Sequence, residues 1–89
     1  MDTRSTIGWN LRRLRVAKGL SQERLALESG IDRAYVGRVE RGSENVTVST
    51  LEAFANVLGV RVSALFRDVD PSDPEPAPLK AGRKPKALN

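Results

Sequence analysis

The stretch SQERLALESGIDRAYVGRVERG, residues 21 to 42, most constrains how this chain can fold. It holds two short helical patterns of apolar residues that meet at Gly30. A glycine ends a helix at little cost, because it readily adopts the left-handed backbone conformation found there. Ser21 and Asp32 are N-cap residue types, and one precedes each pattern. The stretch therefore predicts two helices joined by a turn of only three residues.

Four positions in this stretch fit two helices that cross at a steep angle. Ala26 is small enough to let the second helix pass close by, and Gly30 suits the left-handed turn. Val36 and Val39 fill the wedge between the helices. The second helix is expected to end near Arg41. Other helical hairpins could meet some of these demands, but all four together, with two N-caps, predict a helix-turn-helix.

A helix is also expected before this unit, from Ser5 or Thr6 to Lys18, with Gly19 as its C-terminal stop. Apolar residues recur in this segment at the spacing of one helical face. The residues of that face are Ile7, Leu11, Leu14 and Ala17.

After the unit, Thr47 caps a fourth helix that stops at Gly59. Its inner face consists of Val48, Leu51, Phe54, Ala55 and Leu58. A short fifth helix, from about Val62 to Arg67, is expected to add Leu65 and Phe66 to the core. No strand pattern occurs. The sequence thus predicts an all-α domain of five helices over residues 1–67.

The composition excludes several classes of function. The chain has no cysteine and no histidine, so it lacks disulfides, thiol nucleophiles and the commonest zinc ligand and general base. We therefore expect no enzyme activity, metal or cofactor. No apolar run approaches the roughly 18 residues of a membrane span, and the N-terminus lacks the apolar block of a signal peptide. A cytoplasmic protein without membrane contact is expected.

The net charge is +4, which favours a polyanionic partner, and the whole excess lies in residues 1–67. Residues 68–89 are neutral and hold all five prolines. Such a segment cannot build a core and is expected to be a disordered, solvated tail. Its basic end, KAGRKPK, could instead add weak attraction to phosphates or contact an acidic protein partner.

The segments LRRLRVAKGLSQERLA, SGIDRAYVGRVERG and TLEAFANVLGV resemble the lambda-repressor and Cro-like helix-turn-helix proteins of the XRE type. This resemblance covers roughly residues 5–67. Within that group, IDRAYVGRVERGSENVTVSTLEAF is similar to the controller proteins of restriction-modification systems. The resemblance implies a homodimer that binds a palindromic double-stranded DNA operator. The third helix of each subunit would lie in the major groove, with half-sites about one helical turn apart.

The N-terminal end of the third helix is the part that would reach base edges. Arg33 could read guanine through O6 and N7, and Ala34 could contact a thymine methyl group. Arg38, just over one turn further on, could reach a base or a phosphate. The alternative is that both arginines are solvated charges on an exposed helix face. Gly37 weakens the helix by roughly 1 kcal/mol relative to alanine, so either a close approach of backbone and DNA favours it or it is tolerated drift.

Gln22 matches the family position whose side chain and backbone N–H bind a DNA phosphate. The full set of expected phosphate contacts is Ser21, Gln22, Arg41, Ser43 and Asn45. Glu44 departs from the controller pattern, which often has an arginine in this loop, and an acid there would repel phosphates. Arg12 and Arg13 could support the backbone contacts or be solvated.

Arg15 and Glu40 correspond to an Arg–Glu pair that joins the first and third helices in the family, so a structural ion pair is expected. The resemblance also suggests the C-terminal helices as the dimer surface. The candidates there are Val57, Val60, Val62 and Phe66, each of which could equally belong to the core.

Two functions of different classes are compatible with these residues. The first is a sequence-specific transcriptional regulator that acts as a homodimer. The second is an antitoxin or antirepressor-like module that uses the same fold to bind a protein partner, a reading that the proline-rich tail favours. An enzyme would need a nucleophile with a base or a catalytic pair of carboxylates, and the sequence offers neither.

Overall fold

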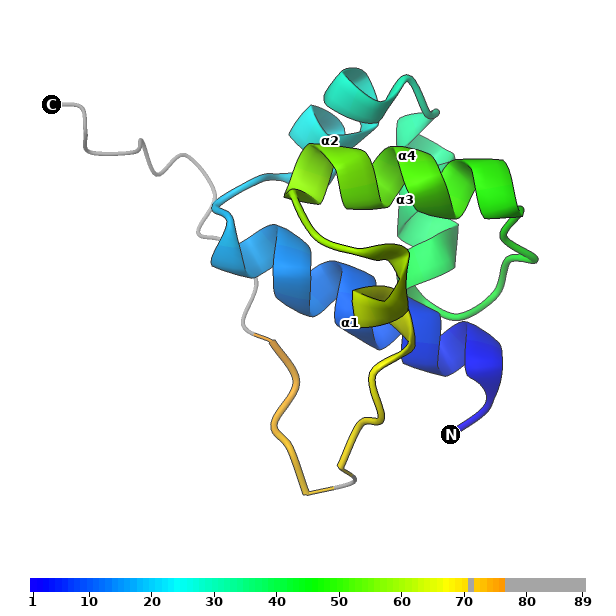
Figure 1. The fold of residues 1–89 in the computed structure, drawn as a ribbon, viewed down its shortest axis with the longest axis vertical. Helices are drawn as coiled ribbons and strands as arrows, with labels where there is room; N and C mark the ends of the chain where they lie inside the picture. Colours follow the sequence, from blue (N-terminus) through cyan, green and yellow to red (C-terminus); the bar gives the residue numbers. More distant parts are fainter. Residues whose placement is uncertain (71, 77–89) are drawn as a thin grey trace, which may run out of the picture.

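The computed structural model describes residues 1–70 and 72–76, and this part of the chain is helical without strands (Figure 1). In chain order the elements are α1 (Thr3–Ala17), α2 (Gln22–Ser29), α3 (Arg33–Glu40), α4 (Val48–Leu58) and the 3₁₀ helix η1 (Val62–Phe66). The predicted all-α class is confirmed, although the fifth expected helix is a short 3₁₀ turn. Of the predicted tail, Pro71 and residues 77–89 lie outside the described residues.

The helices enclose a single apolar core, with α4 packed against α2 and η1 lying against α1 (Figure 1). The buried apolar residues are Ile7, Leu11, Leu25, Ala26, Val36, Val39, Leu51, Phe54, Ala55, Leu58 and Leu65. Every helix of the fold contributes to this set. The two helices of the predicted turn are therefore fixed in place by α1 and α4, and their outer faces are left to solvent.

α1 starts earlier than the sequence analysis expected, and one residue of its expected inner face lies outside the core. Asp2 is its N-cap, and the side-chain Oδ1 of Asp2 accepts a hydrogen bond of 2.8 Å from the Ser5 backbone N–H. Ala17, expected in the core, is exposed. The buried stripe follows the four-residue spacing of Ile7, Leu11 and Arg15, and Ala17 lies about 120° from Leu11 around the helix axis.

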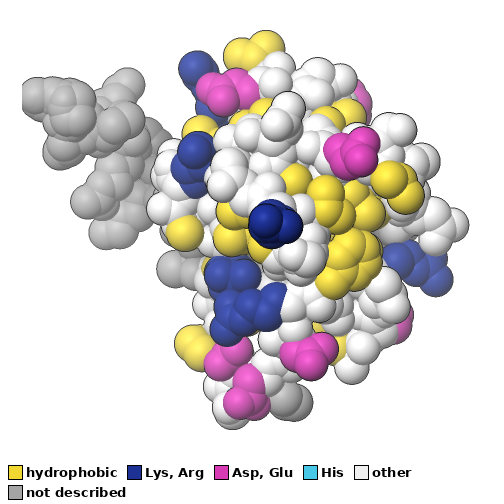
Figure 2. Space-filling view, in the orientation of Figure 1, with side chains coloured by type: hydrophobic (Ala, Val, Ile, Leu, Met, Phe, Trp, Pro, Cys, Tyr) yellow, Lys and Arg dark blue, Asp and Glu magenta, His cyan; other side chains and the backbone are white. Residues whose placement is uncertain are grey.

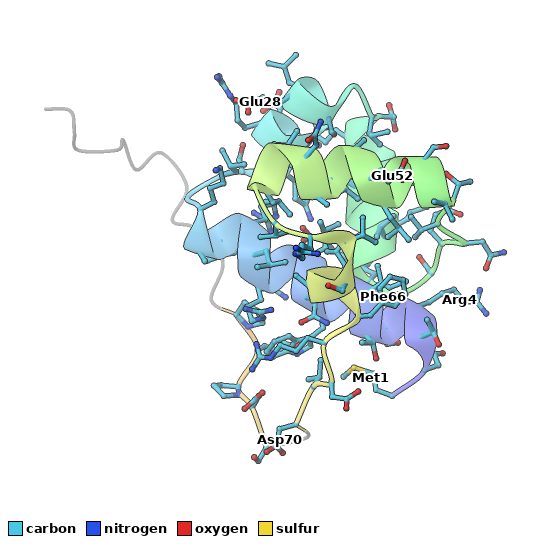
Figure 3. All side chains as sticks on the ribbon, in the orientation of Figure 1. Met1, Arg4, Glu28, Glu52, Phe66 and Asp70 are labelled. Atoms are coloured by element: carbon cyan, nitrogen blue, oxygen red, sulfur yellow. The ribbon has the colours of Figure 1, made fainter. Side chains whose placement is uncertain are left out.

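Phe66 was also expected in the core, and this prediction is wrong, because 43% of its surface is exposed. A 3₁₀ helix has three residues per turn, so Val62 and Leu65 share one face of η1. That face packs on the core, with Leu65 fully buried. Phe66 follows Leu65 directly and therefore points away from the core, as its labelled side chain in Figure 3 shows.

Gly8 permits an unusually close approach of α1 to the end of α3. A Cβ atom at this position would lie 2.3 Å from the carbonyl oxygen of Val39 and 2.7 Å from that of Glu40. No side chain fits such a gap without moving one of the helices. This contact sets the orientation of α3 against α1, and the sequence pattern gave no sign of it.

Asn10 is a buried polar residue that fastens η1 to α1. Its side-chain Nδ2 donates to the carbonyl oxygens of Leu65 and Arg67 at 3.1 and 2.8 Å. Arg13 Nη2 donates to the Asn10 Oδ1 at 3.2 Å. A buried carbonyl needs a partner, so this amide replaces the hydrogen bonds that the short 3₁₀ turn cannot supply.

Candidate nucleic-acid interface

The turn between α2 and α3 has the geometry that the sequence predicted. Gly30 takes φ 72° and ψ 25° at the end of α2, and the Ile31 N–H donates to the Ala26 carbonyl oxygen at 3.0 Å. Asp32 then caps α3, its Oδ2 accepting from the Tyr35 N–H at 3.2 Å. Ser21 caps α2 in the same way through the Arg24 N–H. The two helices therefore meet as a helix-turn-helix.

α3 turns one face to the core and the other to solvent. Val36 and Val39 are almost completely buried, and Gly37 is buried as well. Arg33 and Ala34, in the first turn, are exposed, as is Arg38. The three residues predicted to read bases thus lie on the solvent side of the helix, and none is enclosed by the protein.

An open cleft of about 420 Å³ lies between the start of α2 and the outer face of α3. It is lined by Arg12, Arg15, Ser21, Gln22, Glu23, Arg33, Gly37, Glu40 and Arg41. The cleft lining thus includes one of the predicted base-reading residues and three of the predicted phosphate contacts. The first N–H groups of an α-helix lack partners within the helix, so the start of α2 adds donors to the cationic side chains here.

A buried ionic network lies beneath the cleft. Arg15 Nε donates to Glu40 Oε2 at 2.6 Å and Arg15 Nη2 donates to Oε1 at 3.0 Å, while the two side chains are only 7% and 4% exposed. Arg15 Nη1 also donates to the Leu20 carbonyl oxygen at 2.9 Å. The structure thus links α1 to the end of α3 through the two residues that the sequence analysis paired.

Gln22 takes part in this network, which the sequence did not indicate. Its Nε2 donates to Glu40 Oε1 at 3.0 Å, so the amide is already held by a protein partner. Gln22 and Glu40 are 18 positions apart, and only the fold brings them together. The hydrogen bond fixes the side chain at the mouth of the cleft.

Gly37 forms part of the cleft floor. A Cβ atom there would lie 3.3 Å from Arg41 Nη1 and 3.8 Å from Gln22 Oε1. The missing side chain makes room for the Arg41 guanidinium to lie back along α3 toward Gln22. This packing is a third reason for a glycine at this position, beside the two that the sequence suggested.

The loop after α3 is bound to that helix. The Ser43 N–H and hydroxyl both donate to the Arg38 carbonyl oxygen, at 3.0 and 3.1 Å. The Tyr35 hydroxyl donates to the Asn45 carbonyl oxygen at 3.4 Å. Ser43 and Asn45 therefore lie beside α3, outside the cleft that holds the other three predicted phosphate contacts.

Glu44, in the same loop, forms an ion pair with Arg38. Arg38 Nε donates to Glu44 Oε2 at 2.7 Å, and the Arg38 Cζ lies 5.7 Å from the centre of the Tyr35 ring. The hydrogen bond to Glu44 raises the pKa of Arg38 above its ordinary value. The acid expected to repel phosphates is thus matched with a cation of α3.

A family model described as helix-turn-helix matches residues 11–65. The chain belongs to this helix-turn-helix family. The matched segment runs from within α1 to η1 and contains α2, α3 and α4.

Relatives in the family are transcription factors and control proteins. A hypothetical transcription factor of Neisseria meningitidis is 48% identical over 65 residues, 73% of this chain and 61% of that protein. The control protein C.SmaI of Serratia marcescens is 45% identical over 66 residues, 74% of this chain and 79% of that protein. The crystal structure of the restriction-modification controller protein C.AhdI from Aeromonas hydrophila is similar, with 49% identity, a TM-score of 0.69 and coverage of 71% of this chain and 96% of that chain. The predicted resemblance to XRE-type and controller proteins is confirmed.

The C-terminal part of the family domain has an apolar surface (Figure 2). Apolar side chains gather around α4 and η1 on the face shown there. Val57, Val60 and Val62 are half-buried and pack against the core, whereas Phe66 is exposed. Of the four candidates for the dimer surface, Phe66 therefore offers the most apolar area to a partner.

The start of the tail also reaches α1. Glu75 and Pro76 line a small hollow together with Trp9, Arg12 and Arg41.

Arg13 does not line the cleft. Burial lowers the pKa of Arg13, and the nearby Arg67 charge lowers it further.

None of the helices described here is long and apolar enough to cross a membrane. Within residues 1–70 and 72–76, no three acidic side chains gather in a group that could hold a metal ion.

Proposed function

We propose that this protein is a sequence-specific regulator of transcription that binds double-stranded DNA as a homodimer. The observation that carries the proposal is the exposed first turn of α3, which holds Arg33 and Ala34. Arg33 lines a cleft that Arg12 and Arg41 also line. Membership of the helix-turn-helix family, with relatives described as transcription factors and control proteins, supports it.

In this proposal α3 enters the major groove and Arg33 reads a guanine. Its guanidinium donates to O6 and N7 together, a contact that discriminates against other bases by roughly 1 to 3 kcal/mol. Ala34 contacts a thymine methyl group on a neighbouring base pair. The short side chain of Ala34 lets the start of the helix approach the base edges.

The DNA backbone lies across the mouth of the cleft. The N–H groups at the start of α2, the hydroxyl of Ser21 and the guanidinium of Arg41 donate to phosphate oxygens. Gln22 contributes mainly through its backbone N–H, because its side-chain amide is held by Glu40. Ser43 and Asn45 contact a phosphate on the other side of α3.

Two subunits associate through the apolar surface around α4 and η1, which includes the exposed Phe66 and the half-buried Val57, Val60 and Val62. A symmetric pair presents two α3 helices, so the operator is palindromic with half-sites about one turn of DNA apart.

Selection of duplexes from a random pool tests the proposal. The wild-type chain is expected to enrich a palindrome with a guanine in each half-site. Arg33→Ala should lose roughly tenfold or more in affinity for that palindrome while its affinity for unrelated duplexes changes little. Arg24→Ala is the matched control, because Arg24 is exposed on α2, outside the cleft, and pairs with Glu28. A pool that stays random with the wild-type chain would contradict the proposal.

A further inference from the structure

The ion pair between Arg38 and Glu44 has no part in the fold or in the cleft described above. Both residues sit at the solvent side of α3, and their side chains are 44% and 26% exposed. An exposed ion pair of this kind contributes little to stability. Its position beside the proposed base-reading residues suggests a different role.

We propose that Glu44 is a positioning residue that aims Arg38 at a base, so that the two form a second specificity-determining unit. This inference rests on the proposed DNA-binding function. The guanidinium of arginine has two edges that can each donate two hydrogen bonds. Glu44 binds at Nε, which leaves the edge formed by Nη1 and Nη2 for the O6 and N7 of a guanine.

Two further contacts restrict the Arg38 guanidinium. It lies over the Tyr35 ring, 5.7 Å from the ring centre, and Tyr35 is itself tied to the loop through the Asn45 carbonyl oxygen. The loop is joined back to α3 by the two hydrogen bonds from Ser43 to the Arg38 carbonyl oxygen. An arginine that is already ordered loses less conformational entropy when it binds, and a contact of fixed geometry discriminates better between bases.

The charge of Glu44 contributes to selectivity in a second way. It cancels the attraction of Arg38 for phosphates, which is the same for every sequence. The pair therefore gives up some affinity for DNA in general and keeps the contact that depends on one base. Removal of Glu44 should raise non-specific affinity and lower discrimination at one base pair of each half-site.

The test compares the full chain with its Arg38→Ala, Glu44→Ala and Glu44→Gln variants and the double variant of Arg38→Ala with Glu44→Ala. Each is used in selection from a random duplex pool and in titrations of the selected and an unrelated duplex over a range of salt. Arg38→Ala should reduce discrimination at one base pair by roughly tenfold. Glu44→Ala should lose at least about a third of that discrimination on a logarithmic scale, and only at the same base pair. It should also bind the unrelated duplex more tightly. The slope of log affinity against log salt concentration should be steeper by about 0.9.

Glu44→Gln keeps an oxygen that can accept from Arg38 Nε, so it should restore most of the lost discrimination while keeping the raised non-specific affinity. The double variant should lose no more at that pair than Arg38→Ala alone. Glu28→Ala is the matched control, because it breaks the exposed pair with Arg24 on α2 and makes the same change in net charge. It should leave every base preference unchanged.

Three results would overturn the inference. In the first, Glu44→Ala changes affinity for all duplexes equally and leaves the selected sequence intact. In the second, Arg38→Ala does not reduce discrimination at any particular base pair. In the third, Glu44→Gln fails to restore discrimination. In each case the wild-type chain would still select a sequence, so the proposed function would stand; a wild-type chain that selects nothing would instead contradict that function.

Discussion

The buried pair of Arg15 and Glu40 leads to a quantitative prediction for Glu40→Ala. The substitution removes the carboxylate that receives two hydrogen bonds from Arg15 and one from Gln22. It leaves the Arg15 guanidinium, whose side chain is 7% exposed, with the Leu20 carbonyl oxygen as its remaining partner. A cation in that setting has lost its counter-ion and stays largely shielded from water.

Breaking a buried ion pair from one side costs about 3 to 5 kcal/mol. The hydrogen bond to Leu20 survives, so the low end of that range, about 3 kcal/mol, applies here. In a domain of 60 to 100 residues each kcal/mol lowers Tm by about 4 to 8 °C, so we expect a fall of about 12 to 24 °C.

Thermal unfolding followed by far-UV circular dichroism measures this fall. The control is Glu28→Ala, which breaks the exposed ion pair with Arg24. The side chains of Arg24 and Glu28 are 60% and 37% exposed. An exposed pair of this spacing contributes about 0.3 to 0.5 kcal/mol, so the control should melt within a few degrees of the wild type. The double variant Arg15→Met with Glu40→Leu should be more stable than Glu40→Ala alone. A Glu40→Ala variant with the same Tm as the control would refute the argument that a buried ion pair stabilises the contact between α1 and α3.

Three further substitutions test the packing of α1, the attachment of η1 and the proposed subunit contact. Gly8→Ala should lower the free energy of unfolding by about 2 kcal/mol, although alanine is normally favoured in a helix, because its Cβ would lie 2.3 Å from the Val39 carbonyl oxygen. A urea midpoint equal to that of the wild type would show that α1 and α3 have room to separate. Asn10→Leu should lower the free energy of unfolding by about 1 to 3 kcal/mol in the same measurement, because it leaves the Leu65 carbonyl oxygen without its partner. An unchanged free energy of unfolding would mean that η1 is held by packing alone. Phe66→Ser should shift sedimentation equilibrium toward the monomer, and an unchanged dimer fraction would place the subunit contact elsewhere.

The local features of the fold could be predicted because each depends on neighbouring residues. The N-caps Ser21, Asp32 and Thr47 and the left-handed Gly30 lie where the sequence analysis put them. N-caps and glycine stops act within one helical turn, so their residue types are informative without any knowledge of tertiary structure. The same reasoning missed the cap at Asp2, so α1 was predicted too short.

The rest depends on contacts between residues far apart in the chain. Asn10 and Leu65 are 55 positions apart, and Gln22 and Glu40 are 18 apart. A polar residue at position 10 gave no sign that it would be buried, and Gly8 looked like any other glycine in a helix. The exposure of Phe66 follows from the 3₁₀ geometry of η1, whereas the apolar pattern fitted an α-helix equally well.

The proposed contact between Arg33 and a guanine in the major groove can be measured by replacing the N7 atom of that guanine. In the selected duplex, the guanine assigned to Arg33 is exchanged for 7-deazaguanine, which lacks that acceptor but pairs normally. We expect the wild-type chain to lose roughly tenfold in affinity and Arg33→Ala to lose almost nothing, because its contact is already gone. Equal losses in the wild-type and Arg33→Ala chains, or no loss in either, would contradict the proposed contact.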